Sequence, residues 1–198
     1  MTTTIPTLPD NAPSFGGRWS RLFGRLCLKA LGWRLTGEMP AYSKVVLVGA
    51  PHSSNWDFVL SMCCSLACGV KLSYLMKKEA FVWPLKGLFL YLGGIPVDRK
   101  ASQDIVPQIT HWIKTSDKVW IAITPEGTRS AVKHWKTGAA RIAWEAQIPL
   151  VLVGWDYPKK TITIGMQWQP TGDANADTEK MKAYVTEHFT GKNPAKSP

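Results

Sequence analysis

Short apolar runs alternate with longer segments of helical periodicity over most of this chain. The runs are rich in valine, isoleucine and leucine and cover residues 44–49, 72–76, 119–124, 149–154 and 161–166. Between and after them, the pattern predicts helices at 57–69, near 84–91, and at 101–115, 137–146 and 177–190. Strands that alternate with helices predict an α/β fold: a single layered domain with a mostly parallel or mixed central sheet flanked by helices.

The length of 198 residues suits one such domain. The alternating pattern places it at residues 37–190. Residues 1–13 are polar and contain proline, and we expect them to be a disordered leader. Residues 191–198 are expected to be a disordered tail.

Residues 14–36 form a basic amphipathic segment. On a helical wheel its cationic side chains fall within an arc of about 80°, next to a face of tryptophan, phenylalanine and leucine. This pattern is typical of a helix that lies in an anionic lipid surface. An ordinary helix that packs on the domain with a basic edge in water fits the pattern too. In the membrane interpretation, the contacts are Arg18, Trp19, Arg21, Leu22, Arg25, Leu26, Lys29 and Trp33.

The sequence does not predict a transmembrane helix. Its longest apolar stretch without charge, residues 58–70, is shorter than the roughly 20 residues that a spanning helix needs. The N-terminus has neither the charged nor the apolar region of a signal peptide. We therefore expect a cytoplasmic protein, peripheral on the cytoplasmic face of a membrane.

The charge balance favours an anionic partner. Lysine and arginine number 24 against 14 acidic residues, a formal net charge of +10. Phospholipid headgroups, a phosphorylated substrate or nucleic acid would suit this excess. Nucleic acid fits poorly, because the arginines occupy separate turns and no groove-reading or RNA-stacking motif is present. The four cysteines lack the spacing of a disulfide framework or a zinc site, so we expect no metal.

A histidine and an aspartate stand five positions apart, where the first predicted strand ends and the first predicted helix begins. Within one regular helix, His52 and Asp57 would point about 140° apart. A turn between them lets the Asp57 carboxylate hold one imidazole nitrogen, while the other nitrogen can take a proton. This is the base-and-orienter part of a catalytic triad. No GxSxG elbow supplies a nucleophilic serine, and no GxxxxGK[ST] or GxGxxG loop predicts nucleotide binding.

Other turns carry groups that suit an anion. Arg129 can hold a phosphate through two parallel donors, and Gly127 allows close approach of the backbone. Glu126 could accept a hydrogen bond from a substrate hydroxyl or orient the arginines. Because ligands collect at the carboxyl ends of strands in open α/β sheets, we expect these turns and His52 to share one crevice. The candidate substrate-binding residues are Arg99, Glu126, Gly127, Thr128, Arg129 and Lys136.

Four motifs follow one another along the chain. They are His52-x4-Asp57, the run GIPVDR at 94–99, the run EGTR at 126–129 and the strand IPLV at 148–151. Over residues 44–155 this order resembles the glycerolipid acyltransferase family, the 1-acylglycerol-3-phosphate acyltransferases and their relatives. The resemblance implies that His52 is the catalytic base assisted by Asp57. It also implies that the second and third motifs bind the glycerol phosphate of the acceptor.

The implied reaction moves a fatty acyl group from acyl-CoA or acyl-ACP to the free hydroxyl of a lysophospholipid. It needs no covalent intermediate and no cofactor, and the implied partners are the donor, the acceptor and a phospholipid membrane surface. Pro51 stands where many relatives have asparagine, which leaves the identity of the acceptor open. A lyso-aminolipid or a lipid A precursor is an alternative acceptor, and a non-catalytic lipid-binding module of the same fold is an alternative function.

Overall fold

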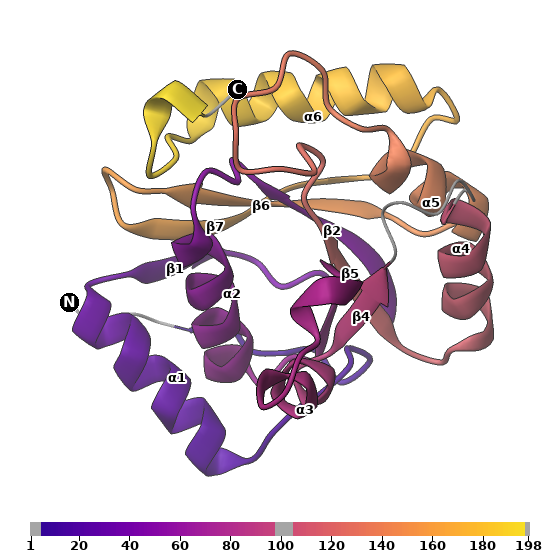
Figure 1. The fold of residues 1–198 in the computed structure, drawn as a ribbon. Coiled ribbons are helices and arrows are strands. Elements are labelled where there is room, and N and C mark those ends of the chain that lie inside the picture. The colour runs from indigo at the N-terminus through magenta and orange to yellow at the C-terminus, as the bar shows by residue number, and fades with distance from the viewer. Residues whose placement is uncertain (1–4, 98–104, 197–198) are drawn as a thin grey trace.

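A computed structural model describes residues 5–97 and 105–196. Figure 1 shows the arrangement of its helices and strands. The strands are β1 (Arg34–Gly37), β2 (Lys44–Ala50), β3 (Leu72–Lys77), β4 (Gly94–Val97), β5 (Val119–Ile123), β6 (Leu150–Asp156) and β7 (Thr161–Trp168). The α-helices are α1 (Arg18–Leu31), α2 (Asn55–Cys68), α3 (Leu85–Tyr91), α4 (Val106–Thr115), α5 (Gly138–Ala146) and α6 (Ala174–His188). Two short 3₁₀ helices are η1 (Lys78–Ala80) and η2 (Pro194–Lys196). The five predicted strands and the helices predicted between and after them are present close to their predicted positions, and β1 and β4 are additional strands.

The described strands form one mixed sheet in the order β1-β7-β6-β2-β5-β3-β4. Neighbouring strands are parallel except β6 and β7, which are antiparallel. Strand β2 lies near the centre, with β5 on one side and β6 on the other. The predicted α/β fold, with a mostly parallel or mixed sheet, is confirmed.

Helices cover both faces of this sheet (Figure 1). Successive side chains of β2 point to opposite faces, as the pleat of a strand requires. Val46 and Val48 pack with apolar side chains of α4, α5 and α6, while Val45 and Leu47 pack with those of α1 and α2. The core therefore has two halves, one on each side of the sheet, which explains why the central strands are apolar throughout.

The amphipathic segment 14–36 is not one helix, as predicted, but a helix followed by a strand. Helix α1 ends at Gly32, whose φ of 73° is left-handed and suits glycine. Trp33 follows with 6% of its surface exposed, and β1 then pairs with β7. Trp33 therefore belongs to the core, and its predicted membrane contact is wrong. Helix α1 lies close to α2 at Gly24, where an added Cβ would be only 2.4 Å from the backbone nitrogen of Ala67.

Terminal segments that were predicted to be disordered contact the domain where the structure describes them. Ala12 is buried, and the backbone N–H of Lys71 donates to the carbonyl oxygen of Pro13 at 2.9 Å. At the other end, Asn193 of the predicted tail donates two hydrogen bonds to Ser53.

Candidate active site

Three neighbouring parallel strands bring the site together. Strand β2 pairs with β5 on one side and with β6 on the other, both in parallel, so their carboxyl ends meet at one edge of the sheet. His52 follows β2, Glu126 follows β5 and Tyr157 follows β6. Residues more than 70 positions apart in the sequence therefore become neighbours.

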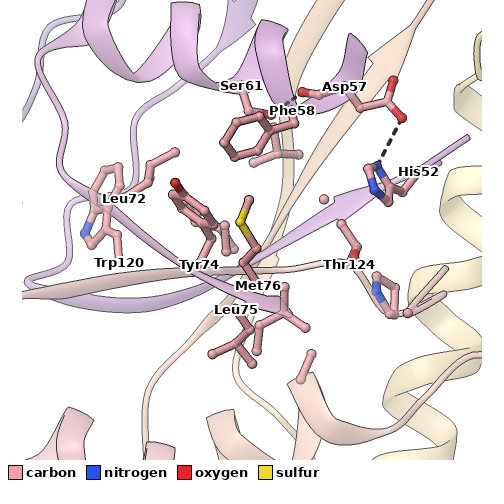
Figure 2. A pocket seen from close by; sticks show the side chains of 18 of the residues that line it. His52, Asp57, Phe58, Ser61, Leu72, Tyr74, Leu75, Met76, Trp120 and Thr124 are labelled. Carbon is pink, nitrogen blue, oxygen red and sulfur yellow. Dashed lines mark hydrogen bonds and ion pairs between the residues drawn. The ribbon is translucent and has the colours of Figure 1, made fainter. Parts of the chain in front are cut away.

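The turn between β2 and α2 brings His52 and Asp57 into contact. Ser54 caps α2 by accepting a hydrogen bond from the N–H of Trp56 at 3.2 Å, and Asp57 stands at the third helical position of a capping box. The Nδ1 atom of His52 lies 3.1 Å from Oδ2 of Asp57 (Figure 2). The predicted contact between the two side chains is therefore present.

The Asp57 carboxylate is fully buried, with 0% exposure, and is held from several directions. Its Oδ2 atom accepts the backbone N–H groups of Ser53 at 2.9 Å and Ser54 at 2.8 Å. Its Oδ1 atom accepts the hydroxyl of Tyr157 at 2.5 Å. Burial, together with this bond, raises the pKa of the Tyr157 hydroxyl, which keeps it protonated and able to donate. These donors and the N-terminus of α2 stabilise a negative charge on Asp57.

Glu126, which was predicted to bind substrate, lies outside the cavity lining and bonds to the backbone of the loop that carries His52. Its Oε1 atom accepts the backbone N–H of His52 at 2.8 Å, and only 5% of the residue is exposed. Its Oε2 atom is buried and has no hydrogen-bond partner among residues 5–97 and 105–196. Burial raises the pKa of the Glu126 carboxyl, and the bond from His52 partly opposes this rise. Glu126 thus fixes the position of His52 relative to the EGTR turn at residues 126–129.

The rest of the Glu126 turn forms a cationic rim. Gly127 has a left-handed φ of 63°, and an added Cβ would lie 3.0 Å from Cε of Lys136. The Lys136 side chain therefore crosses the turn, and its backbone N–H donates to the carbonyl of Pro125 at 2.9 Å. Thr128, Arg129 and Lys136 are exposed, and all of them line the same cavity as His52.

The cavity has a volume of about 780 Å³ and is mainly apolar. Figure 2 shows His52 and Asp57 at one end and a series of apolar side chains that leads away from them. Phe58 lies next to Tyr74, with ring centroids 5.2 Å apart, and burial raises the pKa of the Tyr74 hydroxyl to about 12. A neutral, partly apolar wall of this kind suits a hydrocarbon chain.

The structure thus brings together most of the predicted site. His52, Asp57, Gly127, Thr128, Arg129 and Lys136 line one cavity, and Glu126 lies directly behind His52. Arg99 lies outside the described residues. Within the described part of the chain, no cluster of three or more His, Cys, Asp or Glu side chains is placed to hold a metal ion.

Tyr157 and Asn193 were not predicted to belong to the site. Tyr157 directly follows β6. The rule that ligands collect at the carboxyl ends of strands, which selected His52 and Glu126, would therefore also have selected Tyr157. Asn193 donates from its backbone N–H to Oγ of Ser53 at 3.2 Å and from Nδ2 to the Ser53 carbonyl at 2.9 Å. No pattern in the C-terminal sequence indicates this contact, because it joins residues that are 140 positions apart.

The sequence profile of the family described as Acyltransferase matches residues 34–155, which is more than half of the chain. The protein therefore belongs to the acyltransferase family and is an acyltransferase, as the order of the motifs implied. The profile spans the strands β1 to β5 and most of β6, and so includes every motif of the site.

The fold is also similar to that of a solved acyltransferase. The crystal structure of the 1-acyl-sn-glycerophosphate (LPA) acyltransferase PlsC from Thermotoga maritima superposes with a TM-score of 0.62. The two sequences are 18% identical, and the match covers 86% of this chain and 76% of that one. Comparison with curated proteins gives no significant match.

Proposed function

We propose that this acyltransferase moves a fatty acyl group from acyl-CoA or acyl-ACP to the free hydroxyl of a lysophospholipid. The first candidate acceptor is 1-acylglycerol-3-phosphate. The observation that carries the proposal is the His52–Asp57 pair, which stands where an apolar cavity meets a cationic rim. A lysophospholipid combines these chemistries: a hydrocarbon chain, a hydroxyl group and a phosphate.

His52 acts as the general base. With Nδ1 held by Asp57, Nε2 takes the proton of the acceptor hydroxyl while the oxygen attacks the thioester carbonyl. The new C–O bond forms, the C–S bond breaks, and the carrier thiolate leaves and recovers the proton. The buried Asp57 carboxylate stabilises the imidazolium that exists between these proton transfers. No nucleophile of the protein is needed, since a thioester is already activated.

The remaining groups position the substrates. Arg129 and Lys136 are exposed cations at the cavity rim, where the acceptor phosphate would bind. The apolar wall that includes Phe58 and Tyr74 would hold an acyl chain. Arg99 is a further proposed ligand of the phosphate.

We also propose that α1 holds the protein at the cytoplasmic face of a membrane. Trp19 is 80% exposed, and Leu22, Phe23 and Leu26 are exposed too. Helix α1 packs on α2 through its opposite face, which contains Gly24 and Leu28. Helix α1 thus packs on the domain through one face, and its exposed apolar face supports the proposed membrane contact. None of the described helices is long and apolar enough to cross a bilayer.

The proposal is tested with the purified full-length chain and a panel of lyso-acceptors, each supplied with labelled acyl-CoA or acyl-ACP. Products are identified by mass. Transfer to 1-acylglycerol-3-phosphate at the highest rate would support the proposal. Transfer only to a lyso-aminolipid or a lipid A precursor would reassign the acceptor, and no transfer with any pair would reject the activity.

A further inference from the structure

The segment that leads into α3 exposes an unusual amount of apolar surface. All seven residues from 82 to 88 are exposed, and Trp83 has 91% of its surface in solvent. We call the exposed apolar side chains of this region the α3 face: Val82, Trp83, Leu85, Leu88, Leu90 and Tyr91. Six exposed apolar side chains within ten residues of sequence are more than the scattered exposed hydrophobic residues of a typical soluble monomer, and exposed apolar surface of this kind marks interaction sites.

Cations surround the α3 face. Lys77 and Lys78 precede it, Lys86 lies within it, and all of them are exposed. Glu79 is the one acidic residue in the sequence from Lys71 to Tyr91. Tryptophan and leucine with nearby lysines are typical of a surface that lies at the headgroup level of an anionic bilayer.

The inward side of the same segment reaches the active site. Lys77, Ala80 and Phe89 line the cavity, although their neighbours at 82–88 face solvent. The ring of Phe89 lies 6.4 Å from that of Phe58, the residue after Asp57. One short segment thus contributes an outer apolar surface and an inner wall of the cavity.

The α3 face is also close to the start of α1. The ring centroids of Phe15 and Tyr91 are 5.1 Å apart, in an edge-to-face contact. Only two residues separate Phe15 from α1, so the first turn of α1, which carries the exposed Trp19, begins close to α3.

We propose that the α3 face docks on an anionic phospholipid bilayer, as a second contact beside α1, and that the lipid acceptor passes from the bilayer into the cavity along α3. This inference rests on the proposed function, because it assigns a route to the lipid substrate of that reaction. A bilayer suits the α3 face better than a protein partner, because exposed lysines flank this face and the same segment lines the mainly apolar cavity that would hold the lipid acceptor.

The test compares the full-length protein with the variant Trp83→Ser/Leu88→Ser. Neither residue lines the cavity, and both side chains are exposed, so the fold and the site are left intact. Binding is measured by sedimentation with vesicles of phosphatidylcholine and phosphatidylglycerol. Acyl transfer is measured with a lyso-acceptor embedded in these vesicles and with a short-chain lyso-acceptor that is monomeric in water.

We expect the variant to bind the vesicles at least about tenfold more weakly and to lose a similar factor in kcat/KM for the embedded acceptor. Its kcat/KM for the monomeric acceptor should equal that of the unmodified protein. The matched control is Trp144→Ser, which removes a half-exposed tryptophan from α5 on the other face of the sheet. This control should bind vesicles normally.

Equal vesicle binding by Trp83→Ser/Leu88→Ser and by the unmodified protein would overturn the proposal. A similar loss with the embedded and the monomeric acceptor would also overturn it, because α3 would then act inside the site. If the unmodified protein acylates no acceptor, the proposed function fails, while the sedimentation measurement still decides whether the α3 face binds lipid.

Discussion

The two ends of the active site differ in how firmly the fold holds them. At the catalytic end, Asp57 is fully buried and bonded to His52, to two backbone N–H groups and to Tyr157. At the rim, Arg129 and Lys136 are exposed side chains on a turn. Proton transfer requires fixed geometry within a few tenths of an ångström, whereas a phosphate can be attracted by mobile cations. The difference predicts large effects on kcat from the buried end and effects on KM from the rim.

Among the variants that keep His52, the largest effect is expected for Asp57→Asn. The amide keeps an oxygen that can accept the backbone N–H groups of the loop, but it removes the charge that stabilises the His52 imidazolium. We expect kcat to fall by about 10²–10⁴-fold with the Tm nearly unchanged. Steady-state kinetics and thermal unfolding check this. A fall in kcat of less than tenfold would show that the Asp57 carboxylate contributes little to the function of His52 as a base.

Two variants of Glu126 separate its hydrogen bond from its charge. Glu126→Ala leaves the backbone N–H of His52 without its acceptor, and we expect kcat to fall by about 10–100-fold and the free energy of unfolding by about 1–3 kcal/mol. Glu126→Gln retains an oxygen for this bond and should keep most of the activity. Equal losses in both variants would contradict the positioning role.

The stability of Glu126→Gln should also depend on pH in a defined direction. Burial raises the pKa of the Glu126 carboxyl above its usual 4.5, so the folded state binds this proton more tightly than the unfolded state. The unmodified protein therefore loses stability as pH rises from 4.5 through the raised value. Glutamine does not ionise, so the variant does not lose stability in this way. We expect the variant to have a higher Tm than the unmodified protein at pH values above the raised pKa of Glu126, and the same Tm below pH 4.5. Calorimetry from acid to neutral pH measures this difference.

The rim is tested by Arg129→Ala. Because this side chain is exposed, its loss should raise the KM for a phosphorylated acceptor by about tenfold and leave kcat within a few-fold. Lys133→Ala is the matched control: Lys133 is an exposed cation nearby that does not line the cavity, and its removal should leave KM unchanged. A fall in kcat with constant KM would place Arg129 at the catalytic end instead.

The smallest effect is expected for Tyr157→Phe. The ring still packs against Trp33, whose centroid is 4.9 Å away, but Oδ1 of Asp57 loses its donor. The ionised carboxylate then has one donor fewer, so we expect a kcat that is lower by roughly twofold to tenfold, with the KM values unchanged. An unchanged kcat would mean that Tyr157 only packs.

Much of this fold and site follows from local patterns in the sequence. The strands 44–49, 119–124 and 149–154 are continuous apolar runs, and strands that are buried on both faces of a sheet have this character. His52 and Glu126 follow such strands, so their meeting follows from parallel pairing alone. Strand β1 was hidden, because the amphipathic pattern continues past Gly32, where the left-handed glycine ends the helix.

The contacts made by Tyr157, Glu126 and Asn193 could not be predicted from the sequence, because they join turns that are far apart along the chain. Glu126 was predicted to bind substrate, because the sequence of its turn does not show that this carboxylate is buried. Its bond to the backbone of His52 arises from how the turns after β2 and β5 approach each other. Asn193 reaches Ser53 only because the segment after α6 returns to the carboxyl edge of the sheet.

In the proposed reaction, the His52 imidazole, oriented by the buried Asp57 carboxylate, removes the proton from the acceptor hydroxyl. The most direct measurement is acyl transfer by His52→Ala, with labelled acyl thioester and 1-acylglycerol-3-phosphate and products read by mass. We predict no product above the background reaction, with unchanged Tm and unchanged vesicle binding. Turnover near that of the unmodified protein would contradict the account.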